Sequence, residues 1–95
     1  ERTIEAARRA GMTHFEGLAL RVRGRLHAAR GDAAAARAEL DAAAVILEGL
    51  GSRIELGRTL VLRGGLGPDS AADLAHAREL FAASGAVGDL RGVPT

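Results

Sequence analysis

Helix-start signals recur along this chain at nearly equal intervals, and this spacing limits the possible folds more than any other feature. Four residues of the type that caps a helix N-terminus stand 19, 20 and 18 positions apart: Thr13, Asp32, Ser52 and Ser70. Three of them are followed three positions later by an acidic residue, as in a capping box: Thr13–Glu16, Ser52–Glu55 and Ser70–Asp73. Such even spacing is typical of an array of helical hairpins.

Helix-stop signals agree with this interpretation. Glycines follow four apolar periodic segments, where a left-handed residue commonly ends a helix: Gly11, Gly31, Gly51 and Gly85. The sequence GPDS at 67–70 separates two further segments. We expect helices over 1–10, 13–30, 33–49, 53–65 and 70–83, and the start of another after Ala86. No segment alternates as a strand does, so the sequence predicts an all-α fold.

Two stretches of the chain match each other directly. Residues 10–26 and 50–66 share six residues at an offset of 40: Gly11/Gly51, Gly17/Gly57, Leu20/Leu60, Arg23/Arg63, Gly24/Gly64 and Leu26/Leu66. A second match has an offset of 34: Leu40/Leu74, Ala43/Ala77, Gly51/Gly85 and Leu56/Leu90. The second unit is therefore about six residues shorter, with the loss near residues 65–70.

Small residues at regular positions predict close contact between helices. Gly24 falls inside a helix, where glycine costs roughly 1 kcal/mol relative to alanine, and a close helix neighbour would explain that cost. A drift towards glycine in a GC-rich genome is the alternative. The residues expected to pack helix against helix are Gly24, Ala36, Leu40, Ala43, Gly64, Leu74 and Ala77.

The spacing of Gly24, Gly31, Ala36, Leu40 and Ala43 resembles that of a tetratricopeptide repeat. The resemblance implies antiparallel helical hairpins stacked as a short right-handed α–α superhelix. It divides the chain into the end of a preceding repeat (1–10), a first repeat (12–50), a shorter, degenerate second repeat (51–84) and the start of a further helix (85–95). The chain would then be one module from a longer protein.

The same resemblance implies a concave groove that two arginines face and a third could join. Arg21 and Arg25 lie four residues apart on one helix, and Arg58 of the next unit could join them. Guanidinium groups bind carboxylates through paired hydrogen bonds, so these residues are candidates for binding a protein or an acidic peptide. The alternative is a solvated arginine face that Glu16 and Glu55 balance.

Composition excludes several other functions. The chain has 13 basic and 12 acidic residues, a balance that does not favour nucleic acid, and no cysteine for a disulfide or a thiolate metal site. Its three histidines lack metal-ligand spacing, and residues 64–70 lack the Lys-Ser/Thr ending of a phosphate loop. No apolar run is long enough for a membrane span. We expect a cytoplasmic protein with no catalytic residues, cofactor or metal.

These observations predict a non-catalytic interaction or sensing module. Residues 36–58 and 77–92 also resemble repeats that follow the nucleotide-hydrolysing core of large bacterial regulators: predicted signalling ATPases, nucleotide cyclases and transcription activators. The alternative is a small-ligand sensor that binds a metabolite in the groove. Apolar residues near both ends, such as Ile4 and Val93, look uncapped. This predicts either that the chain belongs to a longer solenoid or that it forms a weak homodimer through its ends.

Overall fold

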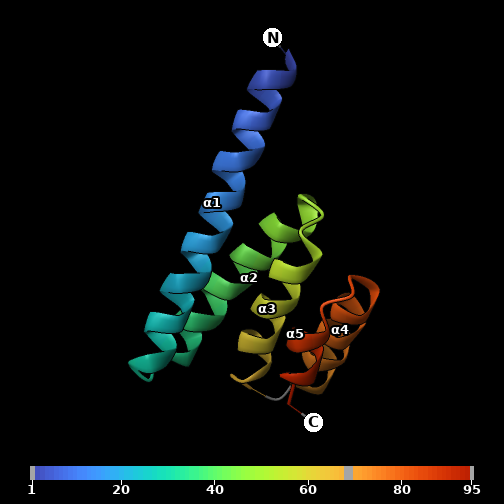
Figure 1. The fold of residues 1–95 in the computed structure, drawn as a ribbon. Helices are drawn as coiled ribbons and strands as arrows, with labels where there is room; N and C mark the ends of the chain where they lie inside the picture. Colours follow the sequence, from blue (N-terminus) through green and yellow to red (C-terminus); the bar gives the residue numbers. More distant parts are fainter. Residues whose placement is uncertain (1, 68–69, 95) are drawn as a thin grey trace.

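The computed structural model describes residues 2–67 and 70–94, and this part of the chain is helical without strands. Its five helices are α1 (Arg2–Ala29), α2 (Ala33–Gly49), α3 (Arg53–Gly64), α4 (Ser70–Ala83) and α5 (Val87–Arg91). Figure 1 shows α1 extending well past the other helices at its N-terminal end. The described part measures 46 × 30 × 18 Å along its principal axes. The predicted all-α class is confirmed.

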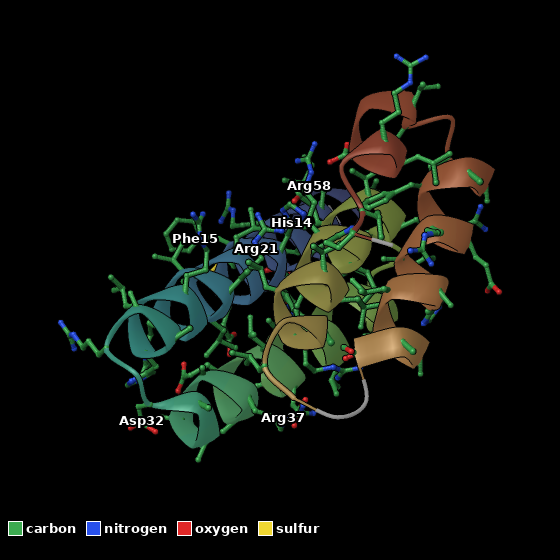
Figure 2. The ribbon with its side chains drawn as sticks, turned by 90° about the horizontal axis from the view of Figure 1, so that it is seen from below. His14, Phe15, Arg21, Asp32, Arg37 and Arg58 are labelled. Carbon is green, nitrogen blue, oxygen red and sulfur yellow. The ribbon has the colours of Figure 1, made fainter. Side chains whose placement is uncertain are left out.

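Local signals at the α1–α2, α2–α3 and α4–α5 turns act as expected. The Asp32 side chain, at the turn between α1 and α2 (Figure 2), accepts a hydrogen bond at 3.0 Å from the Ala35 N–H, which confirms it as an N-cap. Gly31, Gly51 and Gly85 have φ values of +80°, +69° and +70°. Glycine adopts this left-handed backbone without the steric penalty of other residues, so these positions end their helices.

The predicted break between residues 10 and 13 is wrong, because α1 runs through it as one helix of 28 residues. Gly11 lies inside the helix and is not among the glycines with positive φ. The Thr13 hydroxyl donates to the Arg9 carbonyl at 2.9 Å, four residues earlier, instead of capping a new helix. The chain therefore accepts one glycine in a helix interior where the sequence suggested a stop.

The other two capping boxes also differ from expectation. Ser52 occupies the N-cap position of α3, but its side chain makes no capping hydrogen bond, and Glu55 binds Arg21 instead. In α4 the Asp73 carboxylate accepts from Arg63. Residues 68–69, part of the predicted turn, lie outside the described residues. At these two helix starts, the acidic residues of the expected capping boxes therefore form contacts between helices.

The hydrophobic core lies among α2, α3, α4 and the C-terminal segment. Its buried cluster consists of Ala44, Leu47, Leu56, Leu60, Ala77, Phe81 and Val93. Among described residues, α1 contributes no buried hydrophobic side chain to the core, and its fully buried positions are Gly17 and Gly24. Helix α1 therefore packs against the core cluster through a partly buried side chain, Leu18, and meets α2 closely at its two buried glycines.

Glycines bring the paired helices together at four places, two in each helix pair, and the two helix pairs are equivalent in these contacts. A Cβ added to Gly24 would lie 2.9 Å from Leu40, and one added to Gly64 would lie 3.2 Å from Leu74. Two turns earlier on α1 and on α3, a Cβ added to Gly17 would lie 3.3 Å from Leu47, and one added to Gly57 would lie 2.5 Å from Phe81. Within each pair one residue number rises as the other falls, so both helix pairs are antiparallel. All four contacts obey the offsets of 40 and 34 seen in the sequence.

The C-terminal end is covered, contrary to expectation. Val93 is buried, Leu90 packs against the core cluster, and the Arg78 guanidinium donates to the Pro94 carbonyl. The short helix α5 folds back beside α4 and α3 (Figure 1), which a pattern of apolar residues alone could not indicate. Ile4 at the other end is 60% exposed.

Candidate functional site

A groove between α1, α3 and the C-terminal segment contains all three predicted binding arginines. Its volume is about 360 Å³, and it is lined by Arg21, Arg25, Arg58, Val61, Leu62, Phe81, Gly88, Asp89 and Gly92. The predicted groove residues therefore lie around one hollow. Its apolar lining residues are Val61 and Leu62 of α3 and Phe81 of α4, and its charged lining residues are the three arginines and Asp89.

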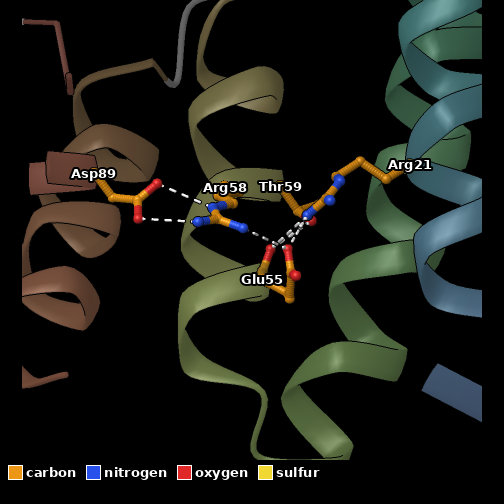
Figure 3. Close-up of polar contacts among 5 residues, drawn as sticks. All are labelled: Arg21, Glu55, Arg58, Thr59 and Asp89. Carbon is orange, nitrogen blue, oxygen red and sulfur yellow. Dashed lines mark hydrogen bonds and ion pairs between the residues drawn. The ribbon is translucent and has the colours of Figure 1, made fainter. Parts of the chain in front are cut away.

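Arg21 is occupied by a contact within the protein. Its Nη1 donates to the Glu55 carboxylate at 2.8 Å and to the Glu55 carbonyl at 3.3 Å, which ties α1 to α3 (Figure 3). Both side chains are largely shielded from solvent, with exposed fractions of 18% and 25%. The hydrogen bond from Arg21 lowers the pKa of Glu55 below its ordinary value, and Arg58 adds to the effect.

Arg58 is occupied as well. Its Nε and Nη2 donate to the two carboxylate oxygens of Asp89 at 3.0 and 3.1 Å, a bidentate pair that joins α3 to α5 (Figure 3). The hydrogen bond to Asp89 raises the pKa of Arg58, and the same bond lowers the pKa of Asp89. Arg21 and Arg58 therefore connect helices, and a ligand would have to compete with their carboxylate partners.

Arg25 differs from the other two arginines. It is exposed, it lines the groove, and it forms no ion pair within residues 2–67 and 70–94. Its guanidinium lies beside a hollow with the apolar side chains Val61 and Leu62. Of the three predicted groove arginines, Arg25 is the one whose charge remains available to a carboxylate ligand.

The predicted packing residues lie between the helices. Gly24 and Gly64 are buried against Leu40 and Leu74 as described above, and Leu74 is half-buried against the core cluster. The alanines and Leu40 are almost completely buried, at 0–1% exposure: Ala36, Leu40, Ala43 and Ala77.

Sequence reasoning did not identify a second polar cluster, centred on Arg63. Arg63 donates to both Asp73 oxygens at 3.0 and 2.8 Å and to Asp41 at 3.0 Å, so it joins α3 to α4 and to α2. These bonds raise the pKa of Arg63, with the Asp73 hydrogen bond as the main cause. The signal was present, because Arg63 matches Arg23 at the offset of 40, and Asp73 matches Glu39 at the offset of 34.

Other kinds of site find little support. Among the described residues, no three His, Cys, Asp or Glu side chains gather as they would around a metal ion. The histidines are separate: His14 and His27 lie on α1, and His76 lies on α4. Within the described part of the chain, each helix is too short or too polar to cross a membrane.

Comparison of the chain with protein-family models, curated proteins and solved structures finds no match.

Proposed function

We propose that this chain is a non-catalytic helical-repeat module, of the tetratricopeptide type, that binds a protein segment in the groove between α1 and α3. The observation that carries the proposal is Arg25, an exposed cation without an ion pair in the described structure, beside an apolar hollow of about 360 Å³. A ligand with a carboxylate and an apolar side chain matches this combination.

The repeat assignment is supported by contacts that recur between the two helix pairs. Gly24–Leu40 and Gly64–Leu74 are equivalent at offsets of 40 and 34, as are Gly17–Leu47 and Gly57–Phe81. A duplicated hairpin explains this better than chance does, because each contact depends on two residues. A place in a larger bacterial signalling or transcription regulator, acting in the cytoplasm, is part of the same proposal and derives from the sequence resemblance.

The groove geometry changes which arginine the binding test should target. Replacing Arg21 or Arg58 would remove a contact between helices, so a loss of binding would not separate recognition from folding. Arg25→Glu reverses the available charge without breaking an ion pair within the described residues. Arg53→Glu is the matched control, because Arg53 is also exposed and lies at the start of α3, outside the groove.

The experiment titrates each protein into a fluorescent acidic peptide that contains leucine and follows its anisotropy. We expect Arg25→Glu to weaken binding at least about tenfold, the loss of one charge-assisted hydrogen bond, while Arg53→Glu changes it little. Circular dichroism shows whether both variants keep their helices. Equal binding by wild type and Arg25→Glu would refute the groove assignment.

A small-ligand sensor is the second candidate, and the size of the hollow favours it. Its volume falls within the ~300–1,000 Å³ typical of small-molecule sites. Such a sensor would show a rise in melting temperature with a small apolar carboxylate such as a branched-chain keto acid, and Arg25→Glu would remove that rise. A peptide-binding module would bind the acidic peptide without responding to the small carboxylate.

A further inference from the structure

Helix α1 carries a row of exposed apolar side chains along one face. Met12, Phe15, Val22 and Leu26 are 67%, 73%, 54% and 51% exposed, and the half-buried Ala19 completes the row. The positions 12, 15, 19, 22 and 26 are spaced 3, 4, 3 and 4, the spacing of the core positions of a coiled coil. We call these five residues the α1 stripe.

The α1 stripe faces away from the rest of the protein. At 100° per residue, its mean direction lies roughly 180° from that of Gly17 and Gly24, which contact α2. Figure 2 shows Phe15 projecting from α1 on the side away from the other helices. A continuous apolar row of this kind on a small protein usually marks an interface.

We propose that the α1 stripe binds the α1 stripe of a second copy of this chain, as an antiparallel two-helix coiled coil. The charged residues beside the stripe favour a second copy of this chain as the binding partner. Glu16 and Arg23 lie seven residues apart along the same edge of the stripe. When two copies pair antiparallel with Ala19 opposite Val22, Glu16 of one copy lies next to Arg23 of the other, and the two-fold axis repeats the pair.

A parallel arrangement is less favourable. It would place Arg25 of one copy next to Arg30 of the other, and neither arginine has an ion-pair partner within the described residues. The antiparallel arrangement brings Arg30 near Arg9, but Arg9 already has Glu5 at 3.6 Å on its own helix. The small side chain of Ala19 near the middle of the stripe also allows the two helices to approach closely.

The expected dimer is weak. Four partly exposed side chains offer on the order of 400 Å² of apolar surface, about half of what one partner contributes to a standard interface. The proposal also relocates the homodimer expected from the sequence. The C-terminal end is covered by the protein itself, so the side of α1 is the available surface.

Sedimentation velocity over a dilution series up to ~1 mM tests the proposal. Wild type is expected to shift from monomer to dimer, and Phe15→Glu to remain monomeric. Val45→Glu is the control, because Val45 is 72% exposed on α2, nearly the same as Phe15. A wild-type monomer at all concentrations would mean that a different molecule covers the stripe, and would overturn the proposal. Equal weakening by Val45→Glu would overturn it too.

The pairing of Glu16 with Arg23 allows a test of orientation. Glu16→Arg and Arg23→Glu should each weaken self-association at least severalfold, because each homodimer then contains two like-charged pairs. An equimolar mixture of the two variants should associate more tightly than either alone, since both cross-chain pairs become opposite in charge. A mixture no tighter than its components would refute the antiparallel register. Circular dichroism on each variant, including Arg23→Glu with its neighbour Glu39, checks the fold.

Discussion

The two helix pairs of this protein, α1–α2 and α3–α4, use the same contacts with different results. Each pair has two glycines facing large side chains, and each has an arginine on the first helix bound to an acid on the second: Arg23–Glu39 and Arg63–Asp73. In α3–α4 one glycine faces Phe81, which is 1% exposed, and Arg63 binds its acid through two hydrogen bonds.

In α1–α2 two of these contacts are looser, the arginine–acid pair and the contact of Gly17 with Leu47. Arg23 is 63% exposed and approaches Glu39 at 3.3 Å without hydrogen-bond geometry, so Glu39 Oε2 is buried without a hydrogen-bond partner. The place of Phe81 is taken by Leu47, and the aromatic residue of this half, Phe15, points outward. A shared contact pattern therefore sets how the helices approach, while the burial of large side chains sets how firmly they hold.

The largest expected difference concerns the two phenylalanines. Phe81→Ala should lower the free energy of unfolding by about 3–5 kcal/mol, because it removes a ring from the core and leaves a cavity. Phe15→Ala should change it by less than ~0.5 kcal/mol, since the Phe15 ring is mostly in solvent. Urea unfolding followed by circular dichroism at low protein concentration measures both. Similar losses would show that α1 contributes to the core as much as α4 does.

The equivalent glycines should differ next. Gly57→Ala places a methyl group 2.5 Å from the buried Phe81 ring, and the resulting overpacking should destabilise by about 1–3 kcal/mol. Gly17→Ala meets Ile46 Cγ2 at 3.1 Å and Leu47 at 3.3 Å, so these neighbours need to give by only a few tenths of an ångström. Its strain is offset by the ~1 kcal/mol that alanine gains in a helix, so the net change should be near zero. A stability loss for Gly17→Ala as large as for Gly57→Ala would contradict the difference between the pairs.

The two arginine–acid pairs come third. Arg63→Ala should cost about 2 kcal/mol, because it leaves the buried Asp73 without its two charge-assisted bonds. Arg23→Ala should cost less than ~1 kcal/mol, the value of an exposed pair. Urea midpoints of the two variants, together with Asp73→Asn as a partner control, provide the comparison. If Arg23 proves the costlier residue to lose, the α1–α2 pair is the more tightly held.

The smallest effect is the pH dependence of the Arg21–Glu55 contact, which joins helix pair α1–α2 to helix pair α3–α4. The pKa of Glu55 is lowered in the folded protein, so the stability contributed by Arg21–Glu55 is present above about pH 4.5 and is lost as pH falls through the lower folded pKa. Glu55→Gln should therefore be less stable than wild type at pH 7, by under ~1 kcal/mol for a partly exposed pair. The difference should shrink at pH 3, measured by urea titration beside Glu48→Gln, an exposed control on α2. A difference independent of pH would assign the effect to shape instead of charge.

Much of the helix layout could be predicted from local signals. The range of α2 and the role of Asp32 follow from one N-cap and one stop glycine, since both act within a single turn of backbone. The break expected at Gly11 and Thr13 fails for a related reason. The same residue types also occur inside helices, where Thr13 binds the Arg9 carbonyl, and only neighbouring structure decides between the two uses.

The sequence indicated where the three arginines lie better than it indicated which acids they bind. Spacing along α1 placed Arg21 and Arg25 on related faces, and both line the groove. Which arginine is free depends on acids 31 to 34 residues away in the chain, Asp89 and Glu55, whose positions follow from packing. The return of the C-terminal segment over α3 supplies Asp89 and two glycines of the groove lining, and no short-range pattern encodes it.

The projecting part of α1 has a mechanical consequence. Every described residue from Thr3 to Met12 is exposed, while the closest contacts of α1 begin at Gly17. The part before Gly17 is roughly 22 Å long at ~1.5 Å per residue, so a tilt of ~10° about the glycine contacts would move its tip by about 4 Å. At the glycine contacts α1 presents no side chain to α2, so Leu18, which packs against the core cluster, and the Arg21–Glu55 pair oppose such a tilt. Helix α1 is thus a lever about Gly17: a shift at Gly24, about 10 Å to the other side, would be roughly doubled at the N-terminal tip.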